Sequence, residues 1–215
     1  LFLRRGIPYK IVGSLRFYDR EEVKDALALL SLLMNPRDEV AFRRIVNKPA
    51  RGLGARSVSA IVDASFDTGG DLVRAAASLE DSFSGKSAKG LSEFVGFITR
   101  MYENLENAEL GSFLKKAFRD SGLLKYHREQ DEVARTQKVA NLEELATAAS
   151  NYPNGREGME AFLEDLELDR ARIAGKDPAK EPGVTLITMH NTKGLEFDRV
   201  IITGMEEGLF PSRPD

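Results

Sequence analysis

The feature that most constrains this fold is a long central stretch of the chain that carries only helical patterns. Over roughly 140 residues, apolar side chains recur at helical spacing and short polar, Gly- or Pro-containing segments interrupt them. The clearest case is Val23, Ala26, Leu27, Leu30, Leu33 and Met34, which Asn35-Pro36 terminates. Helices are expected at 23–34, 39–46, 57–65, 71–78, 88–105, 112–121, 123–129, 135–150 and 159–174. The sequence therefore predicts a mainly α chain.

Signals for β-strands occur only at the two ends of the chain. Tyr9–Val12 is a short candidate strand, and the β-branched runs Val184–Met189 and Val200–Thr203 are typical of buried strands. Since neither end can bury its strand alone, we expect the two ends to pack together. Residues 1–13 and 184–215 are thus predicted to belong to one α/β domain, into which residues 14–183 are inserted as a helical subdomain.

Composition excludes several classes of protein. The chain of 215 residues has no cysteine, so disulfides and thiolate metal sites are excluded, and its two histidines lie far apart, which argues against zinc. Its net charge of −3 gives no general sign of a nucleic-acid partner. With no apolar run near 18 residues and no signal peptide, we expect a cytoplasmic protein without a membrane partner. Both ends are expected to be cuts from a longer protein.

One short window departs from the negative average charge. Between Val40 and Val62 there are five basic residues and no acidic ones. Its centre, residues 48–57, lies between two predicted helices and is called the basic hairpin below. Its glycines let the backbone approach a phosphate, and a following helix would direct free N–H groups at it. This pattern would suit a sequence-independent contact with the DNA backbone, and a tight helix–loop–helix turn with solvated arginines explains it equally well.

A second polar segment follows the candidate strand at 184–189. His190, Lys193, Gly194 and Glu196 place a donor, a cation, a flexible backbone point and a carboxylate after the strand. Open α/β sheets bind ligands at the carboxyl ends of their strands. The alternative is a strand–loop–strand corner whose polar residues serve as caps.

Three segments resemble the UvrD/PcrA/Rep group of superfamily 1 DNA helicases. Thr-x-His-x-x-Lys-Gly-Leu-Glu-Phe followed by Gly-Met-Glu-Glu-Gly-x-Phe-Pro is similar to motif V and the segment after it. Lys48–Ser57 resembles the Pro-x-Arg-Gly-Ile-Gly element of the inserted subdomain, with Leu53 in place of the usual Ile. Gly13–Asp25 resembles Gly-Gly-x-Arg-Phe-x-x-Arg-x-Glu-Ile-Lys-Asp, with Ser14 in place of the second Gly.

The resemblance implies a role for each matching residue. Residues 14–183 would be the inserted subdomain (2B), and 1–13 with 184–215 would be edge pieces of a RecA-like motor domain (2A). The nucleotide would lie near Gly194 and Glu196. Single-stranded DNA would contact Thr188, His190, Asn191 and Arg16. Duplex DNA would contact Lys48, Arg51, Gly52, Leu53, Gly54, Arg56 and Ser57. Asn191-Thr192 departs from the usual Ser-Ala or Ala-Ala, and Arg16 has the alternative of pairing with a carboxylate.

The implied parent is an ATP-dependent DNA helicase that uses Mg²⁺, translocates on one strand and opens duplex DNA. It would act in repair or replication, and other proteins of those pathways are possible partners. The piece itself lacks a phosphate-binding loop: Ser84-Gly85-Lys86-Ser87 has Glu80 where the pattern requires Gly. It also lacks an Asp-Glu-x-x metal box, so we expect no bound metal and no ATP hydrolysis by the piece alone.

Two other interpretations compete with the hypothesis that the inserted subdomain contacts DNA. The inserted subdomain could be a non-catalytic protein-interaction or autoinhibitory module, to which exposed acidic helices such as 157–170 would be suited. A nuclease-fused relative is a third possibility, against which the compact insertion argues. Asp19 and Glu22 are predicted to form a helix-capping pair, and His127 is predicted to lie on the surface.

Overall fold

The computed structural model describes residues 2, 5, 7–12, 17–174, 183–187 and 189–205. Its contacts divide the chain into two compact units. One unit contains Leu1–Ser14 and Asp177–Asp215, and the other contains Leu15–Lys176.

The larger unit is built from helices alone among its described residues. Three short 3₁₀ helices, η2 (Phe17–Asp19), η3 (Phe66–Thr68) and η4 (Glu80–Ser82), accompany the α-helices. The α-helices are α1 (Glu21–Met34), α2 (Glu39–Ile45), α3 (Ala55–Ser65), α4 (Leu72–Ser78), α5 (Gly85–Glu103), α6 (Leu110–Asp120), α7 (Leu123–Ala134), α8 (Lys138–Ala149) and α9 (Gly155–Ala174). The prediction of a mainly α chain is confirmed.

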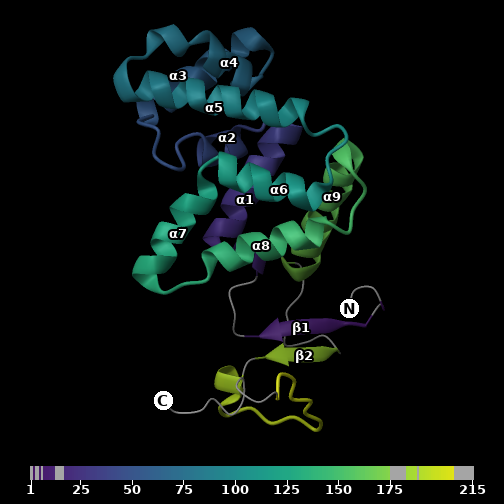
Figure 1. Cartoon of the computed structure of the whole chain (residues 1–215). Helices are drawn as coiled ribbons and strands as arrows, with labels where there is room; N and C mark the ends of the chain where they lie inside the picture. The colour runs from purple at the N-terminus through teal and green to yellow at the C-terminus, as the bar shows by residue number, and fades with distance from the viewer. Residues whose placement is uncertain are drawn as a thin grey trace. The chain divides into compact units, whose positions relative to one another are not determined.

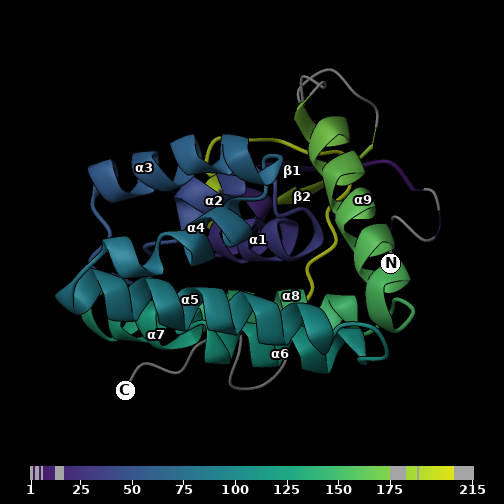
Figure 2. The same ribbon diagram turned by 90° about the horizontal axis from the view of Figure 1, so that it is seen from above.

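Helix α1 is the centre of this unit (Figure 1). It packs against α2 on one side and against α7, α8 and α9 on others, while α3, α4 and α5 form a neighbouring group. Figure 2 shows the same unit from above, with α9 against α1 and α6. Leu29, Leu30 and Val23 of α1 are fully buried in a core that also takes Phe42 of α2 and Phe94 of α5. The run of Ala and Leu explains both the helix and its burial.

The helix starts are set by side chains that cap them. Asp38 accepts from the backbone N–H of Ala41 at 2.9 Å at the start of α2. Asp71 caps α4 through the N–H groups of Val73 and Arg74. The predicted cap of α1 is wrong: Arg20 is the N-cap residue and no side chain caps the helix. Asp19 instead ends η2 and pairs with Lys24 at 3.3 Å.

The smaller unit contains two short parallel strands. Strand β1 (Tyr9–Val12) pairs with β2 (Val184–Ile187), with Tyr9 opposite Val184 and Val12 opposite Ile187. The two flanks of the helical unit are thus paired side by side (Figure 1). A 3₁₀ turn, η5 (Met189–Thr192), follows β2.

The strand predicted at Val200–Thr203 is not formed. Residues 199–205 have no regular structure, and Val200 and Ile201 are 67% and 90% exposed. A strand needs a neighbour for its backbone N–H and C=O groups, and in the described part of the chain β1 is paired only with β2. The expected burial of this run, and of Val184, which is 41% exposed, is therefore also wrong here.

Among the described helices, none has both the length and the apolar character that crossing a bilayer requires.

Candidate nucleic-acid interface

The basic hairpin connects α2 to α3 in the helical unit. Its backbone is organised by Asn47, whose Oδ1 accepts from the N–H of Arg51 at 2.7 Å and of Leu53 at 3.3 Å. Leu53 is 2% exposed and anchors the loop in the core. Gly54 is the N-cap residue of α3 and provides no capping side chain, so the first N–H groups of this helix point out of its end without a side-chain acceptor.

The hairpin packs closely on the start of α5. Gly52 has φ of +80°, and a Cβ there would lie 3.2 Å from Cγ of Lys86 and 3.3 Å from the backbone N of Ser87. A Cβ on Gly90 would lie 2.3 Å from the carbonyl O of Arg51. Both glycines are therefore required for close packing of the hairpin on α5, a role distinct from the approach of Gly52 to phosphate that the sequence predicts.

Arg51 faces inward. Its Nη1 donates to the carbonyls of Ile45 and Val46 at 3.1 Å and of Lys48 at 3.0 Å, and Nη2 donates to Ser121 at 2.9 Å. The guanidinium also lies 5.0 Å from the ring centroid of Phe94. Burial lowers the pKa of Arg51 to about 10, so it remains charged at neutral pH. A phosphate contact by this group, as predicted, would require these bonds to break.

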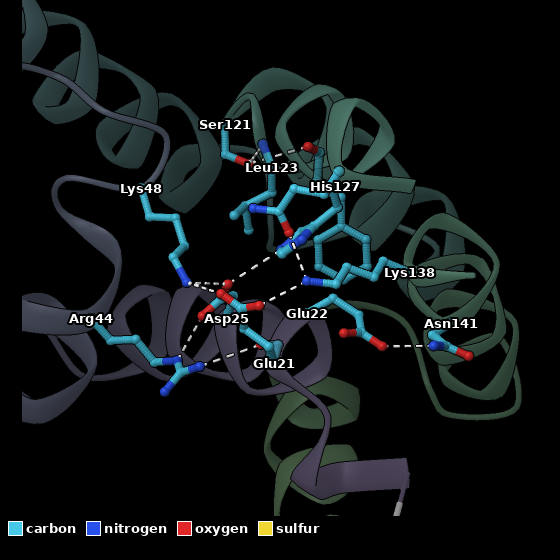
Figure 3. Close-up of polar contacts among 12 residues, drawn as sticks. Glu21, Glu22, Asp25, Arg44, Lys48, Ser121, Leu123, His127, Lys138 and Asn141 are labelled. Carbon is cyan, nitrogen blue, oxygen red and sulfur yellow. Dashed lines mark hydrogen bonds and ion pairs between the residues drawn. The ribbon is translucent and has the colours of Figure 1, made fainter. Parts of the chain in front are cut away.

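Lys48 also points inward, toward a buried carboxylate on α1 (Figure 3). Its Nζ lies 2.7 Å from Oδ2 of Asp25, which is fully buried, and 3.0 Å from Oε1 of Glu21. Arg44 of α2 reaches the other oxygen of Asp25 at 2.7 Å, without the alignment of a hydrogen bond. Lys138 of α8 donates to Glu21 at 2.7 Å. A contact of Lys48 with DNA, as predicted, would therefore require its ion pairs with Asp25 and Glu21 to break.

The charges of this network stabilise one another. Lys138 and then Lys48 lower the pKa of Glu21 to about 2 by hydrogen bonding. Burial raises the pKa of Asp25, but contacts with His127 and Lys48 and the charge of Arg44 outweigh it, so the pKa lies below its usual value. Burial lowers the pKa of Lys48, yet Asp25 and Glu21 raise it overall. Both carboxylates and the lysine are therefore charged at neutral pH.

His127 belongs to the same network, and the prediction that it lies on the surface is wrong. It is fully buried, and its Nε2 lies 3.2 Å from Oδ2 of Asp25. Sequence reasoning missed this pairing because the two residues are 102 positions apart (127 − 25). A signal for Asp25 was present, since it is a carboxylate on a helix rich in apolar residues, next to Ala26 and four residues before Leu29.

Arg56 is the member of the hairpin that faces solvent. Its side chain is exposed in the first turn of α3, and none of the described residues forms a hydrogen bond or ion pair with it. Ser57 is half-buried, and Gly52 and Gly54 are exposed. Beside the hairpin lies a pocket of about 510 Å³ with two lysines and two arginines on its walls. Its lining residues are Pro49, Ala50, Arg51, Lys86, Lys89, Gly90, Glu93, Phe97, Arg119, Asp120, Ser121 and Gly122.

The second predicted site lies in the smaller unit, in the loop that follows β2 (residues 188–198, the motif V loop). Thr192 Oγ1 donates to the carbonyl of Met189 at 2.6 Å, and Gly194 has φ of +84°. Glu196 is exposed. His190 and Asn191 lie in η5, but their side chains are not described. Thr188 and Arg16 lie outside the described residues.

Within the described residues, no group of three or more His, Cys, Asp or Glu side chains could hold a metal ion.

The chain is similar to bacterial helicases over nearly its whole length. The family described as the UvrD-like helicase C-terminal domain matches residues 1–214. DNA helicase II of Escherichia coli (strain K12) is 36% identical over 219 residues, which cover 98% of this chain and 30% of that protein. ATP-dependent DNA helicase UvrD1 of Mycobacterium tuberculosis (strain ATCC 25618 / H37Rv) is 36% identical, and ATP-dependent DNA helicase PcrA of Staphylococcus epidermidis (strain ATCC 12228 / FDA PCI 1200) 34%, each over 98% of this chain. The chain spans about 30% of the length of these relatives.

Proposed function

Because the chain belongs to the UvrD-like helicase C-terminal domain family, we propose that it is part of an ATP-dependent DNA helicase that translocates on single-stranded DNA and unwinds duplex in repair or replication. Residues 1–13 and 184–215 are its pieces of the RecA-like motor domain 2A, and residues 14–183 are the inserted subdomain 2B. ATP and Mg²⁺ bind in the whole protein, with most of their ligands outside this chain.

Duplex contact is the role of the hairpin. The observation that carries this assignment is the exposed Arg56 at the end of α3 where no side chain caps the N–H groups. A helix N-terminus and a guanidinium together favour a phosphate, and neither selects a base. The exposed backbone at Gly52 and Gly54 lies on the same short loop, so a phosphodiester can approach it closely.

The predicted duplex contacts divide into two groups with different roles. Gly52, Gly54, Arg56 and Ser57 are proposed to contact DNA. Lys48, Arg51 and Leu53 hold the loop in place through Asp25, the backbone carbonyls and the core. The inward lysine and arginine thus support binding by fixing the loop, which reduces the entropy lost when DNA binds.

The motif V loop is proposed to link the nucleotide to single-stranded DNA. In this proposal Glu196 and Gly194 contact the nucleotide, and His190, Asn191, Thr188 and Arg16 contact single-stranded DNA. The left-handed backbone at Gly194, which lies between His190 and Glu196 along the chain, supports this division.

The hairpin assignment can be tested with a matched pair of arginines. Arg56 and Arg74 are both exposed in the first turns of α3 and α4, and neither side chain has a partner among the described residues. In the full-length protein, Arg56→Ala should weaken binding to a duplex–single-strand junction and lower the salt slope by roughly one unit. Arg74→Ala should change neither. Fluorescence anisotropy at several salt concentrations, with junctions of different sequence, measures both quantities.

The protein-docking interpretation predicts another result. If Arg56→Ala leaves affinity and salt slope unchanged while the protein stays folded, the hairpin is only a turn, and a helical docking module becomes the better account of the insertion.

A further inference from the structure

Lys48 and His127 contact the same oxygen atom. Nζ of Lys48 lies 2.7 Å and Nε2 of His127 3.2 Å from Oδ2 of Asp25. The imidazole and the carboxylate are fully buried, and the imidazole makes no aligned hydrogen bond through either nitrogen to the described residues. The lysine makes the shorter contact, and the histidine is a second potential donor to the same oxygen (Figure 3).

Protonation of the imidazole would change this arrangement. A neutral histidine can direct an uncharged N–H at Oδ2 and leaves the ion pair to the ammonium group, whereas an imidazolium is a second cation beside the same oxygen and repels Lys48. The proton would come from solvent. One proton added to the buried imidazole of His127 would therefore weaken the Lys48–Asp25 ion pair.

The other charges around the imidazole do not cancel this competition. Arg44 of α2 already occupies the remaining oxygen of Asp25. Glu21 of α1 also pairs with Lys48, at 3.0 Å, and it is held by Lys138 of α8 as well. On α7, Tyr126 places its ring 5.7 Å from Nζ of Lys48. An added proton would thus give Asp25 a third cationic partner, and the other buried carboxylate of α1, Glu22, already accepts from Asn141 at 2.6 Å.

Lys48 transmits the change because it begins the basic hairpin. The hairpin has two polar anchors, Lys48 on Asp25 and Arg51 on the carbonyls and Ser121, and it has the apolar anchor Leu53. Loss of the first anchor leaves the segment before Arg56 less ordered. We propose that His127 is a positioning residue for the duplex contact: its protonation weakens the Lys48–Asp25 ion pair, loosens the hairpin and lowers the affinity for a duplex–single-strand junction.

This inference rests on the proposed duplex contact, and the test uses the full-length protein. Junction affinity is measured by anisotropy at about pH 8 and about pH 5.5 and constant ionic strength. The ratio of the two dissociation constants should be about fivefold larger for the native protein than for His127→Phe, a size typical of coupling between two sites. Single-stranded oligonucleotide is measured in parallel, because any effect of His190 appears there and is shared by all variants.

Two further variants sharpen the test. Arg128→Gln removes a charge from the neighbouring exposed position of α7 and should keep the native pH ratio. Lys48→Met should reduce the ratio to that of His127→Phe, since no ion pair remains to be displaced. Melting temperatures at both pH values show whether each variant is folded.

The inference is overturned if folded His127→Phe keeps the native ratio. Should that variant not fold, an equal ratio for native protein and Lys48→Met overturns it instead. Failure of the proposed function looks different: Arg56→Ala would then leave junction binding unchanged at both pH values.

Discussion

Arg51 donates to the backbone carbonyl of Ser121 across 2.9 Å, joining two residues that are 70 positions apart in sequence. This bond ties the basic hairpin to the turn between α6 and α7. The same guanidinium also donates to four carbonyls of the hairpin region, those of Ile45, Val46, Lys48 and Pro49. Arg51, which the sequence predicts to contact DNA, thus holds the hairpin against the turn between α6 and α7 in the helical unit.

We expect Arg51→Ala to destabilise the fold by about 2–4 kcal/mol, because it leaves several buried carbonyls without a donor. Arg51→Lys should recover little, since a single ammonium group cannot reproduce the planar fork. Urea unfolding of the chain followed by circular dichroism measures the effect. Arg56→Ala is the control and should stay within about 0.5 kcal/mol of the native chain. Equal stability of all three would mean that the Arg51 bonds contribute nothing.

Gly52→Val should cost about 2 kcal/mol or more, because a β-branched residue is strained at φ of +80° and its Cβ would press on Lys86 and Ser87. Gly54→Ala should be nearly neutral, since its φ is −79° and nothing lies within 4 Å of the added Cβ. Thermal melting compares the two. Gly54→Ala is therefore the cleaner probe of DNA approach, and a large loss of stability there would contradict the geometry.

The stability of the helical unit should depend on pH through Glu21. Its pKa is lowered from 4.5 to about 2 by Lys138 and Lys48, so its contribution is present above pH 4.5 and is lost as the pH falls toward 2. Because this carboxylate is half-exposed, the contribution should be about 1 kcal/mol or less. Glu21→Gln should remove that part of the acid profile in urea unfolding. Glu39→Gln, in the first turn of α2, should leave it in place.

In the full-length protein, Glu196→Ala should impair ATP turnover more than DNA affinity, and His190→Ala should do the reverse. The two positions lie on either side of Gly194 in the motif V loop. A roughly tenfold fall in kcat for Glu196→Ala would correspond to about 1.4 kcal/mol. Asp198→Ala, an exposed carboxylate two residues further on, is the control for charge. Steady-state ATPase kinetics and titrations with single-stranded DNA measure the two effects. If both changes affected only protein stability, the motif V loop would be a strand–loop–strand corner without a direct role in binding.

Local sequence was sufficient to locate the helices, although some ends differ: the helix predicted at 123–129 extends to Ala134 as α7. The predicted α2, from 39 to 46, differs from Glu39–Ile45 by one residue, and β1 was placed at its observed bounds. Helix α9 buries Phe162 and Leu166 as its apolar spacing requires. These elements depend on spacing, caps and breakers within a few residues, and such signals can be read from one segment alone.

The direction of each side chain needed the tertiary structure. Lys48 and Arg56 are both cations of one short loop, yet one meets Asp25 of α1 and the other meets solvent. Val200 and Ile201 have the composition of a strand, but a strand also requires a neighbour. His127 is buried because α1 brings a carboxylate to it from 102 positions away (127 − 25). Sequence periodicity determined where helices form, whereas partners distant in the chain decided which charges hold the fold and which remain available for DNA.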